Sequence, residues 1–383
     1  MRILMVSTEY PPMTGGVGRY SSNLIKALRK AGEEVIVLSD EKGGGDYTGI
    51  SPSNTENSKI ILKVINSVKP DVVHIQFEPG LYGLVLDPVN PKNSRTYIDS
   101  FYPDCNIPIF TTFHSLYTFR EWMSQALVIK KKGKTGKLGI PARAAIRGWK
   151  NITNYYSFTE LNRKKLKQSH GGICFSHYML RLLKGGIVIY HGAEPAISSI
   201  PSKEEAREKF YLPLNKKIAV TIGFRTVTKG WDILDKVSLP DNWIIVSNSS
   251  KSYYSKEPLE KSDYKKVIDL ERGFLSEEEL SLLLLASDAV LLPYKVASGS
   301  GVMFDALAHG LPFVASNLEF FKEFAEMGLG LTTKRDPTSF GKAMELLDKN
   351  YDGFKNNVDK FKDSLRWSVV ADQHIKLYAN AMK

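Results

Sequence analysis

The sequence contains very little cysteine. Cys105 and Cys174 are the only two in 383 residues, and no close spacing links them. This usage excludes a Cys-x-x-Cys metal or redox motif and gives no sign of a disulfide framework. Other residue types must therefore carry the chemistry.

The sequence also lacks a long uninterrupted hydrophobic run. The longest apolar stretch, LSLLLLASDAVLLPY, is broken by Ser287 and Asp288 and is too short to span a bilayer. The chain opens with the strand-like segment RILMVST and not with the apolar core of a signal peptide. We therefore expect a cytoplasmic protein, and peripheral contact with the cytoplasmic face of a membrane stays open.

Acidic residues are the minority among the charged side chains. The chain has 52 Lys and Arg against 41 Asp and Glu, a net charge of +11. This excess favours an anionic partner such as a sugar nucleotide, a lipid phosphate, a membrane surface or nucleic acid, although a uniformly solvated basic surface explains it equally well. Residues 130–150, from Lys130 to Lys150, are strongly basic and predict a surface that faces anions or an anionic membrane.

Short apolar segments alternate with helical patterns along the whole chain. This alternation predicts an α/β protein with parallel sheets covered on both faces, and the length predicts two such domains. We expect a first domain over residues 1–196 and a second over 197–364, with a final amphipathic helix over 365–383. KGWDILDKV is expected to begin a helix, and Ser276 with Glu279 has the spacing of a capping box at the start of another.

A glycine loop follows the first predicted strand. Gly15, Gly16 and Gly18 allow the backbone to approach a ligand closely, with N–H groups toward an anion. Ser21 stands where a dinucleotide fingerprint has its last glycine, so the loop does not favour a nicotinamide enzyme.

A second loop of small residues, SGSG, follows the apolar segment AVLLPY and opens a helix. The backbone N–H groups of Ser300, Gly301 and Val302 and the positive end of the helix dipole suit a phosphate group. Asp305 lies about one turn into the helix, within reach of the neutral part of a nucleotide.

Two further loops follow predicted strands. Arg225 and Lys229 in GFRTVTKG stand where α/β sheets bind ligands and could neutralise a diphosphate, or they could be ordinary surface cations. His114 in TTFHS could hydrogen-bond a sugar hydroxyl or a leaving oxygen, and a structural role is the alternative.

The order of these segments resembles a known family. STEYPPMTGGVGRY, PDVVHIQ, TTFH, VIYHGAEP, GFRTVTKGWDIL, SGSGVMFDALAHGLPFVAS and WSVVADQHIKLY follow one another as in the family-4 glycosyltransferases, which are retaining, nucleotide-sugar-dependent enzymes of GT-B architecture. The resemblance implies two Rossmann-like domains facing each other across a cleft, with the last helix crossing back to the first domain.

The resemblance also implies a role for each candidate residue. His114 would contact the donor sugar near the reacting carbon, and Arg225 and Lys229 would clamp the diphosphate and stabilise the departing charge. The donor-binding positions would be Gly15 and Gly16 facing the phosphates and the acceptor, the amides of Ser300, Gly301 and Val302 under the distal phosphate, and Asp305 on the ribose.

The sequence departs from the family pattern in two places. Relatives carry two glutamates eight positions apart, whereas this chain has Asp305 and, eight residues earlier, Ala297. His191 stands where relatives mostly carry asparagine. No D-x-D triplet occurs, so we expect no metal and no cofactor, and the diphosphate would depend on Arg225, Lys229 and helix N-termini.

The resemblance, together with the missing D-x-D triplet, thus implies a retaining, metal-independent hexosyltransferase that uses a nucleoside-diphosphate sugar. Residues 130–150 favour a lipid-linked or other anionic glycan as the hydroxyl acceptor, and same-face transfer is favoured because no convincing nucleophile is present. The alternatives are a GT-B nucleotide-sugar epimerase and a non-catalytic nucleotide-sugar-binding protein. A nucleic-acid partner is not expected, because no recognised motif for one occurs.

Overall fold

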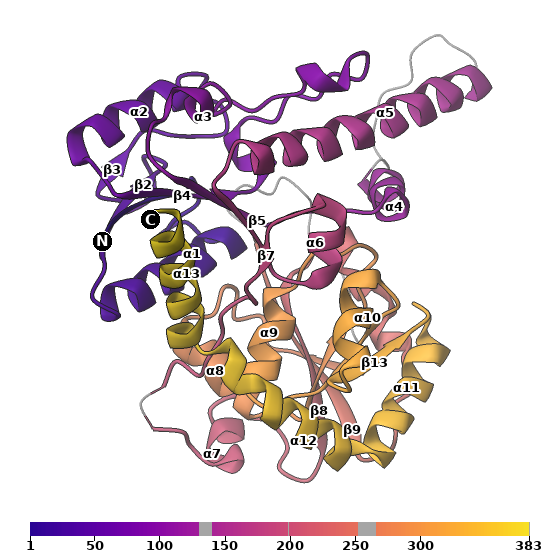
Figure 1. Cartoon of the computed structure of the whole chain (residues 1–383). Helices are drawn as coiled ribbons and strands as arrows, with labels where there is room; N and C mark the ends of the chain where they lie inside the picture. Colours follow the sequence, from indigo (N-terminus) through magenta and orange to yellow (C-terminus); the bar gives the residue numbers. More distant parts are fainter. Residues whose placement is uncertain (130–139, 198, 252–265, 383) are drawn as a thin grey trace. The chain divides into compact units, whose positions relative to one another are not determined.

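The computed structural model describes residues 1–129, 140–197, 199–251 and 266–382, without the side chains of 125–129 and 140–147 (Figure 1). The chain divides into two compact units: unit 1 is Met1–Tyr190 with Ser368–Lys383, and unit 2 is His191–Trp367. The sequence predicts the domain boundaries after residues 196 and 364. No helix in the described ranges combines the length and apolar character that crossing a membrane requires.

Unit 1 is built on a seven-stranded sheet in which every strand pair is parallel, in the order β3-β2-β1-β4-β5-β6-β7. All six residues of β4, VVHIQF, are buried, as expected for a central strand covered on both faces. The strands are β1 (Arg2–Val6), β2 (Glu34–Ser39), β3 (Tyr47–Thr48), β4 (Val72–Phe77), β5 (Ile109–Phe113), β6 (Gly171–Cys174) and β7 (Ile187–Val188).

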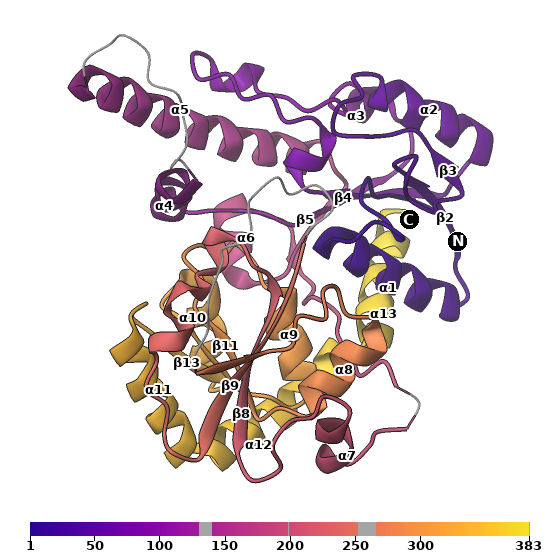
Figure 2. The ribbon, with the colours of Figure 1, turned by 180° about the vertical axis from the view of Figure 1, so that it is seen from behind.

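Helices cover both faces of this sheet. α2 and α3 lie on one side, and α1 and α13 lie on the other (Figures 1 and 2). The Tyr378 hydroxyl of α13 lies 2.5 Å from His74 Nδ1 of β4, which anchors the C-terminal helix in unit 1. The helices are α1 (Gly16–Lys30), α2 (Asn57–Val68), α3 (Phe101–Asp104), α4 (Phe119–Ile129), α5 (Ile140–Lys167), α6 (His177–Leu183) and α13 (Trp367–Ala381), with 3-10 turns η1 (Pro79–Tyr82) and η2 (Pro91–Asn93).

Unit 2 has a six-stranded sheet in the order β10-β9-β8-β11-β12-β13, again with every pair parallel. Phe340, Met344 and Leu347 of α11 (Pro337–Lys349) pack into one apolar cluster with residues of these strands. The strands are β8 (Lys217–Phe224), β9 (Trp243–Ser250), β10 (Val267–Asp269), β11 (Ala289–Leu292), β12 (Phe313–Ser316) and β13 (Gly330–Thr333). The other helices are α7 (Lys203–Glu208), α8 (Glu277–Leu285), α9 (Gly301–Ala308), α10 (Glu319–Glu326) and α12 (Tyr351–Phe361), with 3-10 turns η3 (Val227–Lys229), η4 (Trp231–Lys236) and η5 (Lys362–Leu365).

Two local expectations had different outcomes. The capping box at α8 is confirmed, because Ser276 Oγ accepts the Glu279 N–H at 3.1 Å and the Ser276 N–H donates to Glu279 Oε2 at 2.9 Å. The helix expected to begin in KGWDILDKV is present only as the short 3-10 helix η4 and does not continue as an α-helix. Trp231, Ile233 and Leu234 are buried in this segment. Their spacing is compatible with the three residues per turn of a 3-10 helix.

In each sheet the chain first adds strands toward one edge and then, from a single point, toward the other edge. In unit 1 the neighbours β1 and β4 lead outward to opposite edges, and in unit 2 β8 and β11 do so. Doubly wound sheets bind ligands outside the carboxyl ends of the strands at this switch point. Each unit therefore has one favoured place for a site.

Candidate functional sites at the two strand-order switch points

Helix α9 of unit 2 begins at the switch point with a polar N-cap. Ser300 Oγ accepts the Met303 N–H at 3.2 Å. This cap leaves the amides of Gly301 and Val302 at the helix end, where the first-turn N–H groups have no carbonyl partner within the helix. The predicted phosphate-type turn is thus a capped helix N-terminus, which follows β11 after the loop of residues 293–300.

His191 packs against the start of this helix. Its ring lies parallel to that of Phe304, with centroids 5.7 Å apart and planes inclined by 7°. Nδ1 lies 2.9 Å from the carbonyl oxygen of Gly192, so Nδ1 is the donor. A Cβ atom on Gly301 would lie 3.3 Å from His191 Nε2, which leaves little room for a side chain at this turn. The departure at position 191 therefore sits beside the candidate phosphate amides.

Arg225 and Lys229 lie in the loop that follows β8, the other strand at the switch point. Arg225 is 8% exposed, forms an ion pair with Asp269, and places its guanidinium carbon 5.2 Å from the ring centroid of Trp231. Lys229 Nζ lies 3.8 Å from the ring centroid of Tyr294, which follows β11. Both predicted cations are therefore held by neighbouring side chains at the same edge of the sheet as α9.

Arg335 holds this loop in place, and the sequence analysis missed it. Its Nε donates to the Pro293 carbonyl at 2.8 Å, and its Nη2 donates to the Gly230 carbonyl at 2.9 Å and pairs with Asp232. Gly230 has a left-handed φ of +68°, and a Cβ atom there would lie 2.1 Å from the Pro293 carbonyl oxygen. Arg335 comes from a loop far along the chain, and no local pattern singles it out.

Asp305 and Ala297 lie inside unit 2. The Asp305 residue is 2% exposed, and its carbonyl oxygen accepts from the His309 ring at 2.7 Å. Ala297 is 5% exposed and supplies no polar atom where relatives carry a glutamate. The ribose role expected for Asp305 stays a prediction and requires its carboxylate to become accessible.

In unit 1 the glycine loop encloses a carboxylate of the chain itself. The Gly18 N–H donates to Glu9 Oε2 at 3.0 Å, and a Cβ atom on Gly15 would lie 1.7 Å from Glu9 Oε1. Burial raises the pKa of Glu9, and the backbone N–H groups of Gly18 and Val17 oppose that rise. Glu9 thus accepts from the Gly18 end of the loop, whereas a Cβ atom on Gly16 would have no heavy atom within 4 Å. The expectation that Gly15 and Gly16 face the donor phosphates and the acceptor stays a prediction.

A second carboxyl group, Glu78, follows β4. The Ser115 hydroxyl donates to its carboxylate. Burial raises the pKa of Glu78 to about 7, and the negative charge of Glu9 contributes to that rise. The unit 1 switch point thus carries two neighbouring carboxyl groups that the sequence analysis did not identify, although both follow predicted strands directly.

His114 lies beside these carboxyl groups in the loop after β5. Its Nε2 lies 2.9 Å from Gln76 Oε1, and its ring contacts the ring edges of Tyr20 and Phe175 at centroid distances of 5.4 and 5.2 Å. The amide oxygen accepts, so Nε2 carries a proton and Nδ1 is the remaining ring nitrogen. The imidazole is therefore held in a fixed orientation at the carboxyl edge of the sheet.

The predicted basic surface over residues 130–150 cannot be placed among these sites. Residues 130–139 lie outside the described residues, as do the side chains of 140–147. In the described ranges, no group of three or more His, Cys, Asp and Glu side chains is placed to hold a metal ion. The expectation of a metal-independent site without a cofactor stays a prediction.

Comparison with known proteins gives a sequence match near the start of the chain. Residues 2–57 match the starch synthase catalytic-domain family. Glycogen synthase of Mycobacterium tuberculosis (strain H37Rv) is 51% identical over 57 residues, which make up 15% of this chain and 14% of that protein. The chain therefore matches about a seventh of the length of this curated relative.

Solved structures give likenesses over nearly the whole chain. Sucrose-phosphate synthase from Thermosynechococcus elongatus matches with a TM-score of 0.68 and 15% identity, covering 99% of this chain and 98% of that one. Anabaena HepE in complex with UDP matches with a TM-score of 0.65 and 12% identity over 99% and 100%. Starch synthase IV from Arabidopsis thaliana, bound to ADP and acarbose, matches with a TM-score of 0.60 and 14% identity over 100% and 99%. The predicted GT-B fold of two Rossmann-like α/β domains is confirmed.

Proposed function

We propose that this chain is a retaining glycosyltransferase that moves a hexose from a nucleoside-diphosphate sugar to a hydroxyl acceptor. The observation that carries the proposal is the arrangement at the unit 2 switch point. There the capped start of α9 lies at the same sheet edge as Arg225 and Lys229. Backbone amides and two cations at one edge suit a diphosphate.

Unit 1 supplies the acceptor side of the proposed reaction. Glu9 and Glu78 place two carboxyl groups at its switch point, and their oxygens can accept hydrogen bonds from the hydroxyl groups of an acceptor. His114, held by Gln76, can bind a sugar hydroxyl beside them. The part of the chain that matches starch synthase catalytic domains contains Glu9 and the glycine loop.

The proposed transfer takes place on one face of the sugar. The bond between the anomeric carbon and the donor phosphate oxygen breaks, and the acceptor oxygen bonds to the same carbon. The acceptor proton passes to the departing phosphate oxygen. Arg225 and Lys229 would stabilise the charge that develops on the nucleoside diphosphate, so that their fixed positive charges take the place of a metal ion.

Two of the similar structures support a nucleotide donor. HepE is described in complex with UDP and starch synthase IV with ADP, so uridine and adenosine nucleotides are the first donors to test. The acceptor is proposed as a lipid-linked or other anionic glycan, on the strength of the chain's net charge of +11.

The test combines nucleotide binding with turnover. A thermal-shift screen over nucleoside diphosphates and their sugars identifies the donor, because a ligand stabilises the folded state that binds it. Release of nucleoside diphosphate is then measured with a panel of acceptors that includes glycogen. We expect Lys229→Ala to lower turnover at least about 100-fold, as removal of one charge-stabilising group does.

Lys349→Ala is the matched control, because Lys349 is an exposed cation at the end of α11. Wild-type turnover in Lys229→Ala would contradict the phosphate clamp. Conversion of the donor sugar to an isomer without any acceptor would identify an epimerase instead. Donor binding without transfer to any acceptor would identify a binding protein, which is the alternative that Ala297 favours.

A further inference from the structure

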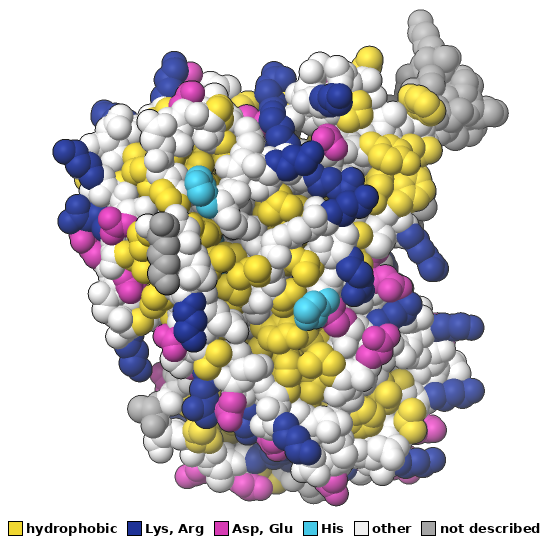
Figure 3. Space-filling model, viewed as in Figure 1, with side chains coloured by type: hydrophobic (Ala, Val, Ile, Leu, Met, Phe, Trp, Pro, Cys, Tyr) yellow, Lys and Arg dark blue, Asp and Glu magenta, His cyan; other side chains and the backbone are white. Residues whose placement is uncertain are grey.

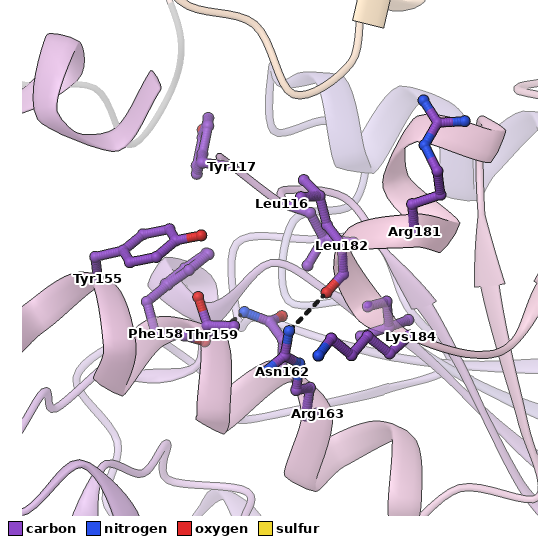
Figure 4. A pocket seen from close by; sticks show the side chains of 11 residues that line it. Leu116, Tyr117, Tyr155, Phe158, Thr159, Asn162, Arg163, Arg181, Leu182 and Lys184 are labelled. Atoms are coloured by element: carbon purple, nitrogen blue, oxygen red, sulfur yellow. Dashed lines mark hydrogen bonds between the residues drawn. The ribbon is translucent and has the colours of Figure 1, made fainter. Parts of the chain in front are cut away.

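Unit 1 contains a cavity of about 190 Å³ between α5, α6 and the loop after β5 (Figure 4). Leu116 and Tyr117 line it and continue directly from His114 and Ser115, so it adjoins the acidic switch point. Sites for drug-sized molecules have volumes of roughly 300–1,000 Å³. The cavity is therefore suited to one sugar ring and its substituents, and is too small for a nucleotide sugar.

Asn162 of α5 supplies a hydrogen-bond acceptor to this cavity. It is 1% exposed and lies among the other lining side chains (Figure 4). Its Nδ2 donates to the Phe158 carbonyl at 2.8 Å, whereas its Oδ1 is buried and has no hydrogen-bond partner among the residues that the structure describes. Because buried polar atoms almost always find a partner, this oxygen points to a ligand that carries a hydroxyl group.

Three cations line the same cavity: Arg163, Arg181 and Lys184. Arg181 and Lys184 are exposed, and Arg163 has a buried Nε without a partner in the described ranges. Its Nη2 reaches the Leu182 carbonyl only at 3.4 Å. None of the described residues that line the cavity is acidic, and lysine and arginine side chains gather over α5 and α6 (Figure 3). This charge favours an anionic group at the cavity.

Aromatic rings form the apolar part of the lining. Tyr117 and Phe158 lie with ring centroids 6.0 Å apart, and Tyr155 completes the aromatic lining. Such rings offer a surface to the C–H face of a sugar. Ligand sites typically combine surfaces of this kind with a few polar groups that fix orientation.

We propose that this cavity binds a phosphate-bearing sugar ring and thereby selects a phosphorylated acceptor. The phosphate pairs with Arg163, Arg181 and Lys184, a ring hydroxyl donates to Asn162 Oδ1, and the aromatic rings cover the ring face. The acceptor role rests on the proposed function, whereas binding itself does not. The same chemistry is found in a free sugar phosphate and in a lipid head group that carries a phosphorylated ring.

Isothermal titration of the full chain tests the proposal with three soluble probes: glucose 6-phosphate, glucose and inorganic phosphate. We expect glucose 6-phosphate to bind at least about tenfold more tightly than either fragment, since ring and phosphate contribute together. Sedimentation with vesicles that contain phosphatidylinositol in phosphatidylcholine tests the lipid source. Binding to vesicles alone supports the proposal with a lipid acceptor, and binding to glucose 6-phosphate alone supports it with a soluble one.

The double variant Arg181→Gln, Lys184→Gln removes two exposed charges and should weaken whichever probe binds by at least about tenfold. Asn162→Leu should weaken it as well, and the surface double variant keeps the test valid if that buried change impairs folding. Lys167→Gln, an exposed change on α5 away from the cavity, is the control and should bind as wild type does.

Equal affinity for inorganic phosphate and glucose 6-phosphate, wild-type affinity in the double variant, or no binding of any probe would overturn the proposal. The thermal shift produced by nucleotides is read in the same proteins. If nucleotides still raise the melting temperature but no sugar phosphate binds, only the proposal for the cavity is refuted. If no nucleotide raises the melting temperature of the wild type, the proposed function is contradicted instead.

Discussion

Replacing Gly15 by alanine places a methyl group where the carboxyl group of Glu9 now lies. The new Cβ atom would be 1.7, 1.9 and 2.1 Å from Glu9 Oε1, Cδ and Oε2. The backbone itself tolerates alanine, because φ at Gly15 is −176°. The Glu9 side chain must therefore move and lose the hydrogen bond from the Gly18 N–H. A hydrogen bond to a charged group contributes about 1.5–3 kcal/mol, so we expect the free energy of unfolding to fall by about 2 kcal/mol.

Two matched variants isolate this cause. In a Glu9→Ala background the obstacle is gone, and Gly15→Ala should change the unfolding free energy by less than about 0.5 kcal/mol. Gly16→Ala changes the neighbouring glycine, which has no heavy atom within 4 Å of its would-be Cβ and lies in α1. That substitution should be neutral or stabilise the helix by up to about 1 kcal/mol.

Thermal melting followed by circular dichroism measures the effect. A loss of 1 kcal/mol lowers the melting temperature of a domain of 150–250 residues by about 2–4 °C, so Gly15→Ala should melt about 4–8 °C lower. An equal loss with and without Glu9 would refute the reasoning, because the clash would then lie elsewhere. A comparable loss in Gly16→Ala would refute it too.

Two further predictions concern pH and the loop after β8. Burial raises the pKa of Glu78 to about 7, so the stability that its protonated form contributes is complete below about pH 4.5 and is lost as pH rises through 7. The variant Glu78→Gln should therefore show a smaller fall in melting temperature between pH 5 and 8 than the wild type. An unchanged fall would show that Glu78 does not cause this pH dependence. Gly230→Ala combines a φ of +68° with a Cβ atom 2.1 Å from the Pro293 carbonyl oxygen, and should lower the free energy of unfolding in urea by about 3 kcal/mol. Gly273→Ala has a similar φ of +72° but no heavy atom near its Cβ, and should lower it by only about 1–2 kcal/mol. Equal losses in the two variants would contradict the steric argument.

The parts of the fold that follow from local patterns were predictable from the sequence. Fully apolar runs such as VVHIQF predict central parallel strands because both faces of those strands are covered. The Ser276 capping box predicts the start of α8 because its hydrogen bonds join residues three apart. The prediction for KGWDILDKV went too far because its residue pattern is compatible with a longer helix. In the structure Gly230 is left-handed, Trp231 is buried, and the segment forms a short 3-10 helix.

The candidate sites were predictable only in part, for a physical reason. Arg225 and Lys229 follow a strand directly, so the rule about strand ends finds them. Arg335 acts on Gly230 from 105 residues away, and only the three-dimensional structure brings them together. The cavity at Asn162 is likewise invisible in the sequence, because an unsatisfied buried oxygen is a property of packing and not of residue type.

The two glycine-rich turns show why one motif can serve opposite purposes. In unit 1 the Gly18 N–H is bonded to Glu9, so a phosphate there would have to displace a buried carboxyl group and approach Glu78 as well. In unit 2 Ser300 caps only the Met303 N–H and leaves two earlier amides at the helix end, with Lys229 at the same sheet edge. A ligand phosphate and a protein carboxylate compete for the same backbone N–H donors. In the proposed reaction the diphosphate therefore binds to unit 2, and the acidic turn of unit 1 receives a hydroxyl group.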